Sequence, residues 1–468
     1  MNIKLYKQIC RNCDDILNSK DATENTVAIS SLHVLKEHPV LLEQYLGNNQ
    51  KLNLYKNDSF FFKIFNFFIN FFKEKKNYII SKNLKKKCDV LIISNLINKK
   101  FIENKDDFYF GNLEKILNSS GLKTLIALRN FTEIRSDEFK KKIDNKKIIF
   151  THRTDFFFEI KLIFKIIAEF FNVKKISNKH FKNKNFNIKH LISLRTIAYN
   201  LRFGNQVRNL LMNVKPKILI IPFEGHAWER IVIKSSKEVH NNIKVAAYQF
   251  SSITKYQHSL FRPLKKEYNP DIIFTSGKIT KKIFKNKYDC LVKILGSKKY
   301  LENKIKKSKY NNNFLILPDA FESEMKLLYN FSIDAAKKFP NFKFYYRPHP
   351  SGIKFIKKFK KININNFLIS NNTLEEDALK CSFSIYRNSA AIFETLSYGL
   401  VPIYLDSLNQ LNINPLYSIL PNKFIVQKVD DLKHATQFKD KKKLIKKLQN
   451  YNKDYFMKFD SNSIKTVI

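Results

Sequence analysis

Short apolar runs alternate with longer amphipathic stretches along most of the chain. The runs are rich in Ile, Leu, Val and Phe, and many end at Pro, Gly, Ser or Asn, which is typical of buried β-strands. The stretches between them are long enough to form helices. Strand followed by helix, repeated many times, predicts parallel, doubly wound sheets. The expected strands cover residues 89–94, 122–128, 147–151, 217–221, 244–250, 271–274, 293–295, 313–318, 342–346, 384–386 and 402–405.

The distribution of these strands divides the chain into four regions. At 468 residues the chain suits two ordinary α/β domains with an extension. Residues 1–86 are expected to form a helical N-terminal extension, residues 87–268 a first Rossmann-like domain, and residues 269–440 a second one. Residues 441–468 are expected to form a lysine-rich helical tail that packs back across the domain interface. The expected fold is two Rossmann-like parallel-sheet domains that face each other across a cleft.

Two strongly aromatic segments stand out from this pattern. Residues 60–72 contain eight phenylalanines, with Lys63, Asn66 and Asn70 as one narrow polar stripe on the expected helix. The segment is too short to span a bilayer, so we expect it either to pack inside the protein or to lie in a membrane interface. Residues 156–171 form a second aromatic helix, which is expected to belong to the core.

The composition adds a strong positive charge. Lys and Arg outnumber Asp and Glu by 85 to 41, for a formal net charge of +44, but only eleven of the basic residues are Arg. Because Asn, Ile and Phe are also abundant, much of the lysine excess reflects the amino-acid usage of an AT-rich genome. No helix-turn-helix, zinc-finger or arginine-rich pattern is present, so nucleic acid is not the expected partner.

Cysteine usage and the N-terminal sequence indicate a reducing, cytoplasmic compartment. The chain begins without an apolar signal segment, and its five cysteines are odd in number and scattered. Cys10 and Cys13 form a pair, but no second pair follows at zinc spacing. We expect a cytoplasmic protein that contacts the inner-membrane surface through residues 60–72 and its basic side chains, which anionic lipid head groups attract.

The main candidate site begins at the loop Arg347-Pro348-His349-Pro350. This loop directly follows the strand at 342–346, and its two prolines enforce a sharp change of direction. Ligands of open α/β sheets bind beyond the carboxyl ends of the strands. An Arg and a His at such an end favour an anionic, nucleotide-like ligand.

A helix start completes this candidate site. Asn388 and Ser389 follow the next expected strand and can cap a helix over residues 390–398, which carries Glu394. A capped helix start adds amide donors and a favourable dipole for an anion. Asp319 and Gly277 also follow expected strands and are weaker candidates for the same ligand.

A second candidate site follows the strand at 217–221. Its loop carries Glu224 and His226, and a carboxylate there can take a proton from an acceptor hydroxyl while the His orients it. Trp228 and Glu229, together with His258 on a later loop, are expected to contact the acceptor. The alternative is an ordinary capped helix start, with Glu229 and Arg230 paired in solvent.

These motifs resemble those of bacterial GT-B glycosyltransferases that use CMP-activated sugars, the sialyl-, polysialyl- and Kdo-transferases. Their His-Pro pair corresponds to His349-Pro350, and their two serines correspond to Asn388 and Ser389, so one serine is replaced. Their acidic-acidic-Gly motif corresponds to Phe223-Glu224-Gly225, in which the first acidic residue is missing. The Glu-Gly-His-Ala-Trp-Glu segment also resembles Glu-Gly-x-x-Trp-Glu in a group of bacterial surface-carbohydrate biosynthesis proteins.

The resemblance implies a GT-B-like, metal-independent glycosyltransferase. It would move an acidic sugar, such as a sialic acid or Kdo, from a CMP donor to a lipopolysaccharide, O-antigen or capsule glycan, with no cofactor besides the CMP-sugar substrate. Glu224 would be the general base, assisted or replaced by His226, and His349 would stabilise the departing CMP phosphate. The expected donor contacts are Arg347, Pro350, Asn388, Ser389, Glu394, Gly277 and Asp319.

Three alternatives stay open at this point. CDP-glycerol phosphotransferases also carry a His-Pro pair and release CMP, so the transferred group is not fixed by that pair. The departures at Phe223 and Asn388 are compatible with a non-catalytic surface-carbohydrate assembly protein on a GT-B-like fold. A nucleic-acid binder is the third alternative, which salt-sensitive binding without nucleotide preference would favour.

Overall fold

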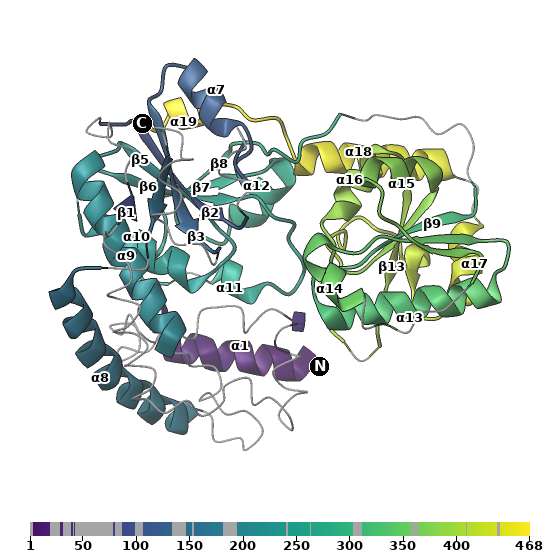
Figure 1. The fold of residues 1–468 in the computed structure, drawn as a ribbon, viewed down its shortest axis with the longest axis horizontal. Helices are drawn as coiled ribbons and strands as arrows, with labels where there is room; N and C mark the ends of the chain where they lie inside the picture. Colours follow the sequence, from purple (N-terminus) through teal and green to yellow (C-terminus); the bar gives the residue numbers. More distant parts are fainter. Residues whose placement is uncertain are drawn as a thin grey trace. The chain divides into compact units, whose positions relative to one another are not determined.

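The computed structural model forms two compact domains (Figure 1). The first domain comprises residues 4–250, 258–298 and 458–468, and the second comprises residues 1–3, 251–257 and 299–457. The structure describes residues 3–18, 29–30, 39–40, 42, 78–79, 87–98, 106–132, 147–151, 154–180, 194–239, 242–262, 264–302, 311–356, 359, 364–408, 410–437 and 440–468. The expected aromatic segment at 60–72 lies outside the described residues.

The first domain contains an eight-stranded sheet in the order β1-β4-β3-β2-β5-β6-β7-β8. All neighbouring strands are parallel except β1, which runs antiparallel to β4. The central strand β2 pairs through Ile92 with Ile126 on one side and Ile220 on the other. The strands are β1 Tyr78–Ile79, β2 Val90–Leu96, β3 Thr124–Asn130, β4 Lys147–Phe150, β5 Ile218–Pro222, β6 Lys244–Gln249, β7 Ile272–Thr275 and β8 Leu291–Ile294.

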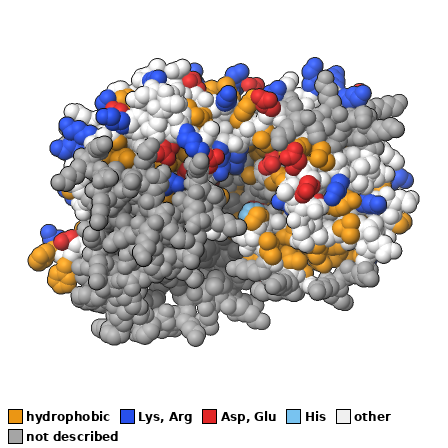
Figure 2. All heavy atoms as spheres, turned by 45° about the horizontal axis from the view of Figure 1, so that its top comes forward, with side chains coloured by type: hydrophobic (Ala, Val, Ile, Leu, Met, Phe, Trp, Pro, Cys, Tyr) orange, Lys and Arg blue, Asp and Glu red, His pale blue; other side chains and the backbone are white. Residues whose placement is uncertain are grey.

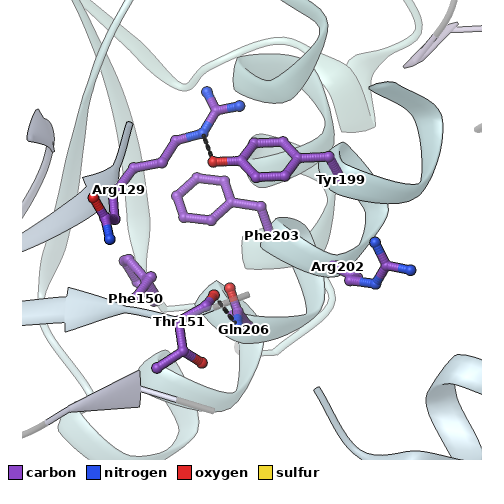
Figure 3. A pocket seen from close by; sticks show the side chains of 8 residues that line it. Arg129, Phe150, Thr151, Tyr199, Arg202, Phe203 and Gln206 are labelled. Atoms are coloured by element: carbon purple, nitrogen blue, oxygen red, sulfur yellow. Dashed lines mark hydrogen bonds between the residues drawn. The ribbon is translucent and has the colours of Figure 1, made fainter. Parts of the chain in front are cut away.

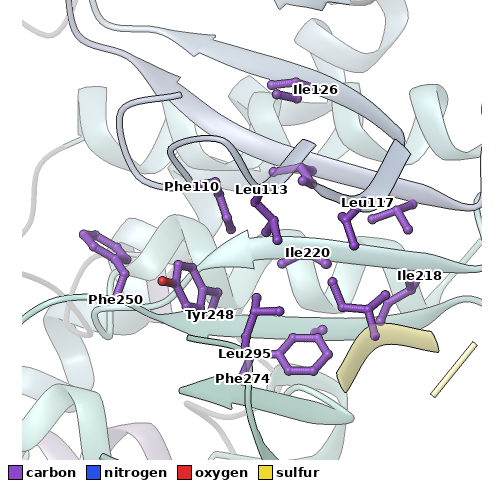
Figure 4. Close-up of a cluster of buried hydrophobic side chains, with 14 of the residues drawn as sticks. Phe110, Leu113, Leu117, Ile126, Ile218, Ile220, Tyr248, Phe250, Phe274 and Leu295 are labelled. Carbon is purple, nitrogen blue, oxygen red and sulfur yellow. The ribbon is translucent and has the colours of Figure 1, made fainter. Parts of the chain in front are cut away.

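Both faces of this sheet are buried, because alternate residues of each strand enter opposite cores. Val90 and Ile92 of β2 pack into one cluster with α7 and the C-terminal α19 (Figure 4). Leu91 and Ile93 pack into the other cluster, which contains residues of α9 and α10. The helices of this domain are α1 Ile3–Asn18, α7 Leu113–Ser119, α8 Phe156–His180, α9 Leu194–Val214, α10 Ala227–Lys237, α11 His258–Phe261, α12 Lys278–Phe284 and α19 Asn462–Lys465, with a 3-10 turn Lys266–Tyr268.

The aromatic helix α8 forms as expected, but several of its phenylalanines are not core residues. Phe157, Phe164 and Phe171 recur every seven residues and are 71%, 69% and 61% exposed. Leu162 and Ile166 are buried instead, in a cluster with residues of α9. The prediction that the phenylalanines of this helix belong to the core is therefore wrong for these three. Their spacing places them on one face of the helix, away from the face that packs on α9.

The second domain contains a six-stranded, fully parallel sheet in the order β11-β10-β9-β12-β13-β14. Its strands are β9 Asn313–Leu317, β10 Lys343–Tyr346, β11 Phe367–Ile369, β12 Phe383–Tyr386, β13 Val401–Leu405 and β14 Ile425–Val426. Its helices are α13 Glu322–Lys338, α14 Ile353–Ile356, α15 Leu374–Lys380, α16 Ala391–Ser397, α17 Asp431–Thr436 and α18 Lys441–Tyr455, with 3-10 turns Pro350–Gly352 and Asn422–Phe424. The expectation of two Rossmann-like parallel-sheet domains with a helical N-terminal segment is confirmed by these two sheets and by α1.

The boundary between the domains differs from the expected one. We expected the second domain to begin at residue 269, but β7 and β8 extend the first sheet beyond β6. The main segment of the second domain begins at Lys299. The expected C-terminal tail is also divided, since α18 belongs to the second domain and residues 458–468 belong to the first. Gly296 accommodates this return: it has φ +95°, and a Cβ there would lie 2.2 Å from the Lys458 carbonyl oxygen.

Charges of both signs lie on the described part of one face of the molecule. On the face drawn in Figure 2, Lys and Arg side chains form small groups with Asp and Glu side chains among them. The described part of this face therefore carries no single continuous basic patch. Among the described residues, no helix is both long enough and apolar enough to cross a membrane.

Candidate functional site

Each sheet reverses its strand order at one point. In the first domain β2 lies between β3 and β5, and in the second domain β9 lies between β10 and β12. The loops that leave the two strands at such a point diverge to opposite faces of the sheet and open a crevice at the carboxyl ends. The loop after β5 carries Glu224 and His226, and the loops after β9 and β12 carry Asp319 and Asn388. Both predicted sites therefore lie at a topological switch point of their own sheet.

The loop after β5 is held by the carboxylate of Glu229. This side chain is fully buried and accepts hydrogen bonds from the backbone N–H groups of Glu224 (3.1 Å), Gly225 (2.9 Å) and His226 (2.9 Å). Gly225 has φ +84°, and a Cβ there would lie 2.7 Å from the backbone nitrogen of Leu260. The prediction that Glu229 contacts an acceptor is not supported, because its carboxylate is used to shape the loop.

Glu224 and His226 form a partly exposed pair on this loop. Their side chains are 32% and 29% exposed, and His226 Nε2 lies 3.5 Å from Glu224 Oε2. Burial lowers the pKa of His226, but the hydrogen bond to Glu224 and the charges of Glu229 and Glu224 outweigh it, so the pKa is raised. Burial raises the pKa of Glu229 to about 7, against the charge of His226. The Glu224 carboxylate thus favours the protonated form of the imidazole.

This arrangement makes a prediction about titration. Glu224→Gln removes the carboxylate from His226 while keeping the shape of the side chain, so the pKa of His226 is expected to fall. The measurement is an NMR titration of the imidazole signals, with His226→Asn used to assign the signal. Glu238→Gln, on the exposed end of α10, serves as the control and should leave the titration unchanged. An unchanged His226 titration in Glu224→Gln would show that the two side chains do not interact.

Trp228 and Arg230 are core residues rather than surface contacts. Trp228 is 6% exposed and packs edge-to-face on Phe203, with 5.7 Å between ring centroids. Arg230 is fully buried and donates to the carbonyl oxygens of Tyr268 and Arg262 and to the Tyr288 hydroxyl. The expected acceptor contact of Trp228 is therefore not supported, and a solvent-exposed Glu229–Arg230 pair does not form.

Two other predicted site residues have local roles in the first domain. His258 Nε2 lies 2.7 Å from Asp14 Oδ2, and Arg262 also pairs with Asp14, so His258 fastens α1 rather than facing an acceptor. Burial opposes ionisation of Asp14, but these two partners lower its pKa overall. Gly277 precedes α12, and its N–H donates to the Thr280 hydroxyl at 3.1 Å. It belongs to the first domain, so the structure does not bring it into the second-domain cluster.

The second-domain site is bridged across its switch point by one hydrogen bond. Asn388 Nδ2, after β12, donates to Asp319 Oδ2, after β9, at 2.8 Å. Asp319 Oδ1 also accepts from the N–H of Ala320 at 2.6 Å. We expected Asn388 and Ser389 to cap α16, but this helix begins at Ala391 without a side-chain cap. The capping prediction is wrong because the Asn388 amide is bound to Asp319, and Ser389 lies 6% exposed between them and the helix.

His349 stands at the end of β10, where it begins the turn Pro350–Gly352. Its Nδ1 accepts a hydrogen bond from the Ser351 N–H at 3.3 Å and lies 2.8 Å from the Ser351 hydroxyl. Burial lowers the pKa of His349, and the charge of Asp319 only partly opposes this. With Nδ1 used as an acceptor, the neutral ring carries its proton on Nε2. His349 can thus donate one hydrogen bond to an anionic oxygen.

Arg347 and Glu394 occupy different surroundings. Arg347 donates to the carbonyl oxygen of Asn372 and lies 3.6 Å from the buried carboxylate of Asp377, on the β11 side of the sheet edge. With Pro350 it lines a pocket at the ends of β10 and β11. Glu394 is half-buried on α16. Among the residues predicted to contact the donor, Asp319 is hydrogen-bonded to Asn388 and interacts with His349 through its charge.

Sequence reasoning missed the ion pair that supports this site. Arg387, the residue before Asn388, donates from Nε to Glu324 Oε2 at 2.6 Å, and both side chains are at most 2% exposed. Its other nitrogens donate to the Leu405 carbonyl oxygen at 2.9 Å and to Gln410 Oε1 at 2.7 Å. The two residues are 63 positions apart, and no local pattern pairs them. Among the described residues, no group of three or more His, Cys, Asp or Glu is placed to hold a metal ion.

Comparison with known proteins gives matches in backbone arrangement only. No family model and no curated protein matches the chain. A Listeria monocytogenes protein assigned as a UDP-N-acetylglucosamine 2-epimerase has a TM-score of 0.48 and 11% identity, covering 81% of this chain and 95% of its own. The Neisseria meningitidis UDP-N-acetylglucosamine 2-epimerase bound to its substrate has a TM-score of 0.43 and 12% identity, covering 82% and 98%. The spinosyn rhamnosyltransferase SpnG with thymidine diphosphate has a TM-score of 0.41 and 11% identity, covering 81% and 99%. At these values the likeness assigns neither a family nor an activity to this chain.

Proposed function

We propose that this chain is a nucleotide-sugar glycosyltransferase that moves an acidic sugar from a CMP-activated donor to a bacterial surface glycan. The observation that supports it most is the polar cluster at the second-domain switch point, where Asp319, His349 and Asn388 converge from three strand ends. Switch points of open α/β sheets are where nucleotides bind. The choice of CMP comes from the resemblance of His349-Pro350 and Ser389 to the CMP-sugar enzymes.

On the donor side, His349 would face the phosphate of the leaving CMP. Its Nε2–H would donate to a phosphate oxygen as negative charge develops there, which is how preorganised donors stabilise a transition state. The Asp319 carboxylate fixes the orientation of Asn388 through the 2.8 Å hydrogen bond, so that the Asn388 loop keeps one conformation. Arg347 would add positive charge from the β11 side, and Glu394 would accept a hydrogen bond from the nucleotide ribose.

On the acceptor side, Glu224 would remove the proton from the attacking hydroxyl. Its partner His226 has a raised pKa, which favours the protonated imidazole, so we assign the role of proton acceptor to the carboxylate. The bond that forms joins the acceptor oxygen to the anomeric carbon, and the bond that breaks joins that carbon to the CMP phosphate oxygen. The proton passes from the acceptor to Glu224, and CMP leaves as the anion that His349 stabilises.

The test is release of the nucleotide from defined donors. Purified full-length protein is incubated with CMP-N-acetylneuraminate, CMP-Kdo and UDP-N-acetylglucosamine, and free nucleotide is measured by chromatography with and without a glycan acceptor. The proposal predicts CMP release from one of the CMP-sugars, accelerated by acceptor, and none of UDP. Epimerisation of the UDP-sugar without any CMP release would refute it. Consumption of CDP-glycerol in a parallel incubation would instead establish a phosphotransferase.

A further inference from the structure

Arg129 occupies an unusual position at the carboxyl end of β3. Its side chain is 5% exposed, and its guanidinium carbon lies over four aromatic rings. The distances from Cζ to the ring centroids are 4.6 Å for Phe131, 4.6 Å for Tyr199, 5.1 Å for Phe203 and 4.7 Å for Trp228. Such a box of rings holds a cation through its faces and leaves the edge nitrogens available for hydrogen bonds.

The two terminal nitrogens of Arg129 make no hydrogen bond to the described part of the protein. Among the described residues, the one hydrogen bond of this guanidinium runs from Nε to the Tyr199 hydroxyl at 3.2 Å, and no carboxylate lies within ion-pair distance. Burial lowers the pKa of Arg129, and Tyr199 and the charge of Glu229 oppose this in part. A buried guanidinium normally finds an oxyanion partner, because an unpaired buried charge is costly. Arg202 shows the usual solution, with Glu159 Oε1 at 2.7 Å from its Nε.

Arg129 lines a small pocket (Figure 3). The pocket measures about 40 Å³, room for a small charged group rather than for a whole sugar. Gln206, across the pocket in Figure 3, is already committed, since its amide donates to the Thr151 carbonyl oxygen at 2.8 Å. The pocket is lined by Arg129, Asn130, Phe150, Thr151, Tyr199, Arg202, Phe203 and Gln206.

The same guanidinium adjoins the Glu224–His226 loop. Trp228, whose ring lies under Arg129, follows His226 by two positions at the start of α10. The charge of Arg129 acts on His226, and the charge of Glu229 acts on Arg129. The strand ends of β3 and β5 flank β2, so both lie on the carboxyl edge of the first sheet. A molecule whose hydroxyl reaches Glu224 therefore has Arg129 at the same sheet edge.

We propose that Arg129 binds an oxyanion of the acceptor, a carboxylate or a phosphate group, through its two terminal nitrogens. This inference depends on the proposed function only in calling the molecule that carries the anion the acceptor. A planar guanidinium matches the two oxygens of a carboxylate or phosphate in a fork, which a neutral sugar cannot offer. The acceptor is thus an acidic or phosphorylated glycan rather than a neutral one.

The experiment uses Trp228, the only tryptophan of the chain, as an internal reporter. Tryptophan fluorescence of the full-length protein is titrated with glucuronate and with inorganic phosphate, while glucose and sodium chloride at matched ionic strength serve as controls. We expect a saturable change with at least one oxyanion and none with glucose or chloride. A response to glucuronate alone identifies a carboxylate group, and a response to phosphate identifies a phosphorylated acceptor.

Variants connect the response to Arg129. Arg129→Gln is expected to abolish it, and Arg129→Lys, which keeps the charge without the fork, to weaken binding about tenfold. Arg208→Gln, at an exposed position of α9, is the control and should titrate like the wild type. Circular dichroism shows which variants fold. If Arg129→Gln does not fold, the test uses Arg129→Lys.

Two results would overturn the inference. One is the absence of a saturable response of the wild type to either oxyanion. The other is a response that Arg129→Lys, or a folded Arg129→Gln, retains in full. Either result would mean that Arg129 is a core residue held only by its aromatic rings. The readout does not involve CMP. If CMP does not bind but the oxyanion response is intact, the proposed function fails and the Arg129 site remains. If CMP binds but the oxyanion response is absent, the Arg129 site fails and the proposed function remains.

Discussion

Replacing Arg387 with methionine is expected to lower the free energy of unfolding of the second domain by about 3–5 kcal/mol, as when one partner of a buried ion pair is removed. The change leaves the Glu324 carboxylate buried without its 2.6 Å partner. It also takes away the donors to the Leu405 carbonyl oxygen and to Gln410. Because the chain has two domains and one transition is not assured, the measurement is differential scanning calorimetry with circular dichroism.

Two further variants make this test specific. The double variant Glu324→Leu with Arg387→Met removes both charges, so it is expected to recover part of the loss, since an apolar pair can replace a buried ion pair. Lys338→Met removes an exposed ion pair between Lys338, on the same helix as Glu324, and Asp430, so it is expected to cost much less than Arg387→Met. Equal losses in Arg387→Met and Lys338→Met would contradict a supporting role for the buried pair.

Glu224→Gln is expected to lower kcat for sugar transfer by about 10²–10⁴-fold, the contribution of a general base. The amide keeps the size of the side chain and cannot accept the proton of the acceptor hydroxyl. The KM for the donor should change little, because Glu224 stands in the first domain and the proposed CMP contacts stand in the second. The measurement is steady-state release of CMP with saturating acceptor.

His226→Asn separates the two candidate bases. If Glu224 is the base and His226 is its protonated partner, His226→Asn should reduce kcat less than Glu224→Gln does. Glu238→Gln on the exposed end of α10 provides the matched carboxylate-to-amide control and should keep the wild-type rate. A wild-type rate in Glu224→Gln together with an inactive His226→Asn would assign the base to His226 instead.

Eleven of the strands were predictable because each contains a short, mostly apolar run, whereas β1, β11 and β14 were not expected. The segment 217–221 was expected as a strand, and Ile218–Pro222 forms β5 with every residue buried. The domain boundary could not be predicted in the same way. The runs at 271–274 and 293–295 have the composition of parallel strands in either sheet, and only their pairing with β6 assigns them to the first. Strand pairing joins residues that are distant in the sequence, so a local sequence pattern does not show which strands pair.

The candidate site was also predictable only in part. The polar residues after β5, β9, β10 and β12 were found from the sequence because a polar loop after a buried run marks a strand end. The contacts of their side chains were not found. Glu229 and Trp228 look like surface residues of a helix start, yet both are buried, Glu229 against the backbone of its own loop and Trp228 against Phe203. Asn388 has the chemistry of a cap, but Asp319, 69 positions away, provides a partner that the local sequence does not show.

The most direct test of a CMP donor site in the second domain is calorimetric titration of the full-length protein with CMP, UMP and GMP. We predict binding of CMP in preference to the other two, and loss of that binding in His349→Ala. Ser351→Ala, which removes only the hydroxyl beside His349 Nδ1, should retain most of the affinity. No binding of CMP, equal binding of all three nucleotides, or unchanged binding in His349→Ala would contradict the proposed donor site.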